Sequence, residues 1–94
     1  MKLFISIFIV VLFSSISFAE TDIEKCKSIS EIAGKIMKLR QHGVPVVQII
    51  EAVDPATHNL VYAVYDTPQF SSQEYKQKAI NDIKNEVFVS CMRD

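Results

Sequence analysis

The sequence has no excess of charge of either sign. Ten Lys and Arg residues stand against eleven Asp and Glu residues, for a formal net charge of −1. A protein that binds nucleic acid or anionic lipid through its charge needs a basic patch or stripe. The one concentration of Lys and Arg lies between residues 25 and 40, and it also contains Glu31. We interpret it as a solvated helix face and expect no nucleic-acid partner.

Histidine and glycine are equally scarce, with two residues of each. His42 and His58 would need two carboxylates, such as Glu51 and Asp54, to complete a tetrahedral metal site. The sequence contains no Gly-rich phosphate loop, no nucleophile elbow and no zinc-protease helix. We therefore expect no metal site, no cofactor, no catalytic residues and no enzymatic activity.

The longest apolar run that is present occupies residues 3–18, directly after Lys2. It leads into the tripeptide Ser-Phe-Ala, which ends at Ala19 and has the small-x-small pattern of a signal-peptidase site. The run is too short and too rich in serine for a membrane span, which takes about 20 apolar residues. We predict a cleaved signal peptide, residues 1–19, and a single periplasmic or secreted domain, residues 20–94. After cleavage the mature domain should have no stable membrane insertion. The alternative is that residues 1–19 are not cleaved and serve as an N-terminal anchor.

Two cysteines, Cys26 and Cys91, lie near the two ends of the predicted mature domain. Export places them in a compartment that permits disulfides, and two cysteines allow one intramolecular pairing. In the chain-entropy model a bridge over so long a loop contributes about 4 kcal/mol, which is comparable to the whole stability of a small domain. Because no Cys-x-x-Cys motif is present, we predict a structural disulfide rather than a reactive thiol.

Capping signals and hydrophobic periodicity predict four helices. Gly43 should end the first helix by adopting a left-handed conformation, and Pro45 suits the first turn of the second helix. Ser71 and Glu74 have the spacing of a capping box before the last. The composition of residues 60–65 also suits a strand, although a lone strand would have no convincing partner. The predicted helices cover residues 22–41, 45–53, 56–65 and 72–91.

The two long helices carry apolar residues at spacings of three and four. In the first helix the predicted buried stripe is Cys26, Ile29, Ile32, Ala33, Ile36, Met37 and Leu39. In the last helix it is Tyr75, Ala79, Ile80, Ile83, Val87 and Cys91. Antiparallel packing of these helices would bring the two cysteines together. The predicted fold class is therefore all-α: a small four-helix orthogonal/antiparallel bundle with one disulfide joining the first and last helices.

Proline and aromatic residues gather around two breaks between the helices. The candidate partner-binding residues there are Val44, Pro45, Tyr62, Tyr65, Pro68 and Phe70. Tyrosines beside a proline break often form recognition surfaces. The alternative is that these residues cover the small core and anchor the loop through their hydroxyl groups. On the first interpretation we expect a protein partner, whose identity the sequence does not give. We expect the chain itself to be a monomer or a homodimer.

Two stretches are distinctive: IMKLRQHGVP at residues 36–45 and AVYDTPQF at residues 63–70. Together with Cys91 they resemble a group of small exported bacterial and prophage-encoded proteins of unassigned function. This resemblance covers most of residues 20–94 and implies an all-helical secreted domain with a paired cysteine. It implies no activity and no functional residue.

Two better-understood classes are similar in outline. Periplasmic acid-stress chaperones share the size, cysteine count and export signal, but no motif matches. Immunity proteins that neutralise secreted effectors share a last helix that ends in cysteine, but they usually carry more cysteines. We expect an exported helical interaction module that binds another protein without catalysis. The alternatives are an acid-stress chaperone, which would open when its acids are protonated at about pH 2–3, and an immunity or inhibitor protein against a secreted effector.

Overall fold

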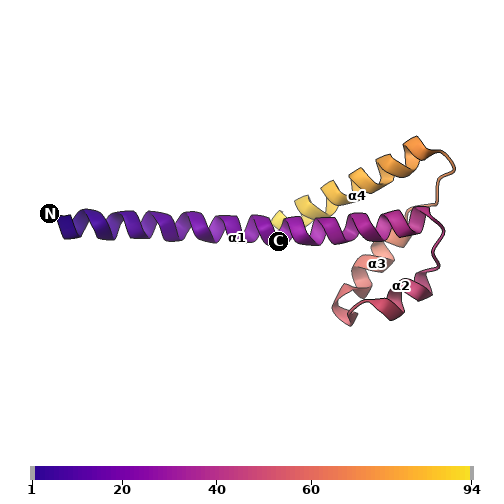
Figure 1. Ribbon diagram of the computed structural model, residues 1–94, viewed down its shortest axis with the longest axis horizontal. Helices are drawn as coiled ribbons and strands as arrows, with labels where there is room; N and C mark the ends of the chain where they lie inside the picture. The colour runs from indigo at the N-terminus through magenta and orange to yellow at the C-terminus, as the bar shows by residue number, and fades with distance from the viewer. Residues whose placement is uncertain (1, 94) are drawn as a thin grey trace.

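The computed structural model describes the backbone of residues 2–93 and the side chains of residues 22–93. Its elements, in chain order, are α1 (Lys2–Gln41), α2 (Val46–Ala52), the 3₁₀ turn η1 (Pro55–Thr57), α3 (His58–Tyr65) and α4 (Gln73–Arg93). Figure 1 shows α4 lying along one side of α1, with α2 and α3 on another side. The all-helical prediction is confirmed over this part of the chain. The strand alternative for residues 60–65 is wrong, because Val61 and Val64 bury the same face of a helix.

The first helix starts earlier than the sequence predicts. It begins at Lys2 rather than near residue 22, because no proline or glycine precedes Gly34 and the backbone meets no helix breaker. The predicted signal peptide, residues 1–19, lies outside the residues whose side chains are described, so its cleavage stays a prediction. Between residues 22 and 93, no helix combines the length and apolar content that a membrane crossing requires.

The end of α1 follows the predicted glycine cap. Gly43 has a φ of 84°, a conformation that glycine adopts without steric penalty. Its N–H donates to the carbonyl of Arg40 at 3.0 Å, and the N–H of Val44 donates to the carbonyl of Leu39 at 3.1 Å. These two bonds form a Schellman motif. The turn carries the chain directly into α2.

The cap of α4 differs by one residue from the prediction. Ser72 Oγ accepts a hydrogen bond from the backbone N–H of Tyr75 at 3.1 Å. Since α4 begins at Gln73, Tyr75 is its third residue and Ser72 occupies the N-cap position. The predicted capping box at Ser71 and Glu74 is therefore wrong in register.

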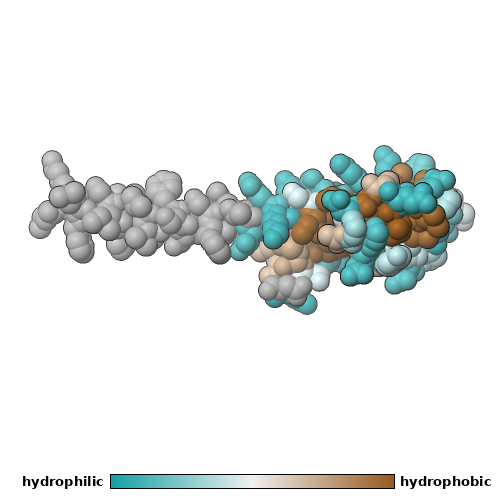
Figure 2. All heavy atoms as spheres, turned by 90° about the horizontal axis from the view of Figure 1, so that it is seen from below, coloured by the Kyte–Doolittle hydropathy of each residue, from teal (hydrophilic) through white to brown (hydrophobic). Residues whose placement is uncertain are grey.

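The hydrophobic core lies where α1 meets α3 and α4, with one contribution from α2. Its buried members are Ala33, Ile36, Met37, Ile49, Val61, Val64, Ala79 and Ile83. Figure 2 shows hydrophobic side chains gathered in a band on the face seen from below, with hydrophilic side chains around them. The predicted stripe of α1 is wrong at two positions, because Ile32 and Leu39 remain 44% and 42% exposed. Ser30 and Gln41 are buried instead.

Small residues on α1 explain this shift, because they let α4 approach closely. Ser30 Oγ donates a hydrogen bond to the backbone carbonyl of Lys84 at 2.8 Å. A Cβ atom added to Gly34 would lie 2.8 Å from two side-chain carbons of Lys84. The face of α1 that α4 covers is thus selected by space as well as by hydrophobicity.

The predicted disulfide is confirmed. Cys26 and Cys91 are joined, with Cα atoms 5.6 Å apart and a sequence separation of 65. Cys26 is buried and Cys91 is half-buried. The bridge ties the last turns of α4 to the middle of α1.

Candidate functional site

The structure divides the six predicted partner-binding residues into two groups. The residues that pack against the core are Val44, Tyr65 and Phe70. The residues that are exposed are Pro45, Tyr62 and Pro68. Half of the predicted residues therefore contribute to the packing of the domain. Hydrogen bonds also join the turn after α1 to the end of α3 and the loop that follows it.

Tyr65 anchors the end of α3 to the turn after α1. Its hydroxyl donates to the carbonyl of Val44 at 2.6 Å. The Arg40 guanidinium lies 5.1 Å from the centre of the Tyr65 ring, and Arg40 Nε donates to the carbonyl of Thr67 at 3.0 Å. Partial burial raises the pKa of Tyr65, and the positive charge of Arg40 opposes this shift. The hydroxyl thus stays protonated and remains a donor at neutral pH.

Gln41 is the positioning residue that sequence reasoning missed. Its side chain is only 1% exposed. Its Nε2 donates to the carbonyl of Pro68 at 3.0 Å, and its Oε1 accepts from the N–H of Phe70 at 2.8 Å. Lys76 Nζ also donates to the Gln41 backbone carbonyl at 2.6 Å, where a cation is favoured by the helix dipole. The sequence holds no signal for this role, because glutamine near a helix end is usually solvated.

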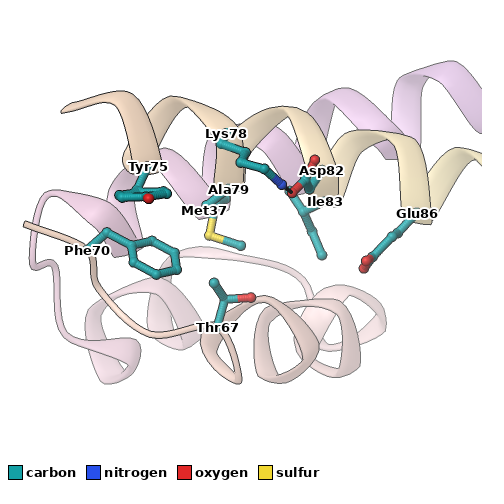
Figure 3. A pocket seen from close by; sticks show the side chains of 9 residues that line it. All are labelled: Met37, Thr67, Phe70, Tyr75, Lys78, Ala79, Asp82, Ile83 and Glu86. Atoms are coloured by element: carbon teal, nitrogen blue, oxygen red, sulfur yellow. Dashed lines mark hydrogen bonds and ion pairs between the residues drawn. The ribbon is translucent and has the colours of Figure 1, made fainter. Parts of the chain in front are cut away.

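A groove opens between α3 and α4, with α1 as its floor. Helix α1 packs against both of these helices, whereas α3 and α4 make little direct contact with each other. The first half of the groove has a volume of about 340 Å³ and is shown in Figure 3. Its lining residues are Met37, Thr67, Phe70, Tyr75, Lys78, Ala79, Asp82, Ile83 and Glu86.

A second hollow of about 510 Å³ continues this groove toward the disulfide. Its lining residues are Ile29, Leu60, Ala63, Ile83, Glu86, Val87, Ser90 and Cys91. Ile83 and Glu86 line both hollows, so the two form one continuous surface along α4. We call this surface the α3–α4 groove.

The α3–α4 groove has an apolar floor and a polar rim. The rings of Phe70 and Tyr75 stand at one end, with their centres 5.9 Å apart. On the rim, Lys78 Nζ lies 2.7 Å from the carboxylate of Asp82, and this hydrogen bond raises the pKa of Lys78. Figure 3 shows the Glu86 side chain extending from α4 into the gap beside α3. Such an arrangement suits the burial of a partner's apolar side chains, with rim charges that fix its orientation.

The two histidines lie outside the α3–α4 groove. His42 Nδ1 donates to the carbonyl of Lys38 at 2.8 Å, and His58 Nε2 donates to the carbonyl of Ile50 at 3.1 Å. Because a carbonyl can only accept, each of these nitrogens carries a proton. Among residues 22–93, no three His, Cys, Asp or Glu side chains are close enough together to hold a metal ion.

No protein-family model, curated protein or solved structure matches this chain. The resemblance to small exported proteins thus stays a prediction from the two distinctive stretches.

Proposed function

We propose that residues 20–94 form an exported helical module that binds another protein in the α3–α4 groove and performs no catalysis. The observation that carries this proposal is the pair of adjoining hollows, which share Ile83 and Glu86. Their volumes fall in the range of about 300–1,000 Å³ that binding sites occupy. The Cys26–Cys91 disulfide supports export, because such bonds persist in oxidising compartments.

The arrangement that we propose for this module is the orthogonal/antiparallel four-helix bundle. Two long-range contacts support it. Ser30 of α1 bonds to Lys84, near the middle of α4. Gln41, at the end of α1, bonds to Phe70, just before α4. The loop that holds Thr67 and Phe70 forms one end of the groove. This loop is also the one in which the sequence predicted partner-binding residues.

The proposal can be tested with a photo-crosslinking amino acid at Tyr75, in cells that make the protein. Tyr75 lines the groove and is 57% exposed. Tyr62 is a matched control, because it is 53% exposed on α3 and does not line either hollow. We expect one discrete adduct from Tyr75 and none from Tyr62. The intact mass should also show a mature chain that starts at Glu20.

A blocking variant makes this experiment specific to the groove. Ala63 is exposed on the groove wall, so Ala63→Arg should abolish the Tyr75 adduct. Ala52→Arg, on the exposed end of α2, should leave the adduct unchanged. Crosslinking from Tyr62 alone would refute the groove as the binding site. An adduct seen only at about pH 3 would favour the acid-stress chaperone instead.

A further inference from the structure

We propose that the occupant of the α3–α4 groove is an amphipathic α-helix of another protein, with a Lys or Arg placed against Glu86. This inference rests on the proposed function and specifies the partner's chemistry at the same site. It follows from the shape of the groove, the lack of backbone partners in it and the charges on its rim.

The shape of the groove fits a helix. Its lining residues on each helix face the same side: Ile29 and Met37 on α1, and Leu60 and Ala63, at a spacing of three, on α3. Thr67, in the loop after α3, continues this wall. At 1.5 Å per residue, the α1 floor spans about 12 Å, and the α4 wall from Tyr75 to Ser90 spans about 22 Å. These lengths correspond to about two to four helical turns. A helix seated between α3 and α4 would cover the side that those two helices leave open.

The backbone of the groove favours a helical occupant over an extended one. Every regular element in residues 2–93 is a helix, whose interior N–H and C=O groups already bond to one another. An extended segment would therefore find no strand edge to pair with. Its polar backbone would lie unpaired over Met37, Ala79 and Ile83, which are apolar and buried. A helix satisfies its own backbone groups and presents only side chains to this floor.

The charges around the groove favour a cation on the partner. Lys78 is already paired with Asp82, and Glu86 has no ion-pair partner within residues 22–93. Residues 41–75, which supply the α3 wall and the loop, contain no Lys or Arg. Arg40 is held by Tyr65 and Thr67. A basic side chain of the partner thus meets an unmatched carboxylate, which gives the complex orientation and specificity.

Synthetic peptides of about four helical turns test this inference directly. The first carries leucines at positions i, i+3, i+4 and i+7, with lysines beside that stripe. The second replaces the lysines with glutamates. The third has the composition of the first but scatters its leucines. Affinities are measured by calorimetry for the full mature protein and for three variants: Glu86→Lys, Glu51→Lys and Ala63→Arg.

We expect the lysine peptide to bind the wild type and Glu51→Lys equally well, since Glu51 is an exposed residue of α2. Glu86→Lys should weaken the lysine peptide about fivefold and strengthen the glutamate peptide. Ala63→Arg should weaken both by about tenfold or more, because it fills the groove. Circular dichroism should show the bound lysine peptide as helical.

Five outcomes would overturn the inference. If the scattered peptide bound as tightly as the lysine peptide, a helical stripe of leucines would not be what the groove recognises. If the lysine and glutamate peptides bound equally tightly, Glu86 would not select a basic partner. A dimer of the protein that Ala63→Arg dissociates would make a second copy the occupant. A Tyr75 adduct without binding of any peptide would refute the helical partner and leave the proposed function standing. Loss of that adduct as well would refute both.

Discussion

At the scale of single residues, Gln41 joins two parts of the chain that are distant in sequence. Its side-chain amide donates a hydrogen bond to the carbonyl of Pro68 and accepts one from the N–H of Phe70. Phe70 lines the groove, so this buried amide also holds one end of the candidate site in place. A buried side-chain amide of this kind is costly to remove, because the backbone groups that it bonds lose their partner.

Replacing Gln41 with leucine should destabilise the protein by about 2 kcal/mol, because the Phe70 N–H and the Pro68 carbonyl lose their partner. Urea unfolding followed by circular dichroism measures this loss. Gln77→Leu is the matched control, since Gln77 makes one exposed bond to Asn81, and its effect should stay within about 0.5 kcal/mol. Equal effects of the two substitutions would show that the amide does not hold the loop.

At the scale of elements, the contact between α1 and α4 depends on small side chains. Ser30 and Gly34 face the backbone and the side-chain stem of Lys84. Ile32 and Leu39, two larger residues that the predicted stripe wrongly included, remain exposed. Ala79 and Ile83 of α4 are buried in the core, and both also line the groove.

The variant Gly34→Leu should destabilise the protein by about 1–3 kcal/mol through overpacking, although leucine is the better helix former. Truncation of the opposing stem in the double variant Gly34→Leu, Lys84→Ala should recover part of that loss. A double-mutant cycle of unfolding free energies measures the coupling, which we expect to reach at least about 0.5 kcal/mol. Additive effects would mean that the two side chains do not meet.

At the scale of the whole molecule, the disulfide joins positions that are 65 residues apart in sequence. A chain of this size gains limited stability from one small core, so a cross-link over most of the domain has a large relative effect. Cys91 also lines the second hollow of the groove. Stability and the candidate site are therefore coupled through this one bond.

Reduction of the disulfide should lower the free energy of unfolding by about 4 kcal/mol in the chain-entropy account. Urea unfolding with and without a reductant measures the change. Reduction of the disulfide should also weaken binding of the lysine peptide, because the last turns of α4 are then no longer bonded to α1. The variant with both Cys26→Ala and Cys91→Ala is the control, and the reductant should not affect it. An unchanged unfolding midpoint for the reduced wild type would contradict this account.

Part of the candidate site was predictable from local patterns. The sequence pointed to the loop with Tyr65, Pro68 and Phe70, because proline and aromatic residues mark it. Of these three, Phe70 lines the groove, whereas Tyr65 and Pro68 line neither hollow. It did not point to Ala63 or Glu86, since an alanine and a glutamate on a helix carry no distinguishing pattern. They belong to the candidate site because they line the hollows between two helices, which no spacing within either helix reveals.

The sequence by itself determined the helical class, the glycine cap at Gly43 and the pairing of Cys26 with Cys91. These follow from local sterics, from periodicity and from the single pairing that two cysteines allow. Only the tertiary structure decided that Gln41 is buried while Leu39 is exposed, and that α3 and α4 stand apart over α1. Those outcomes depend on which helix faces meet, and the space left by small residues such as Gly34 selects those faces.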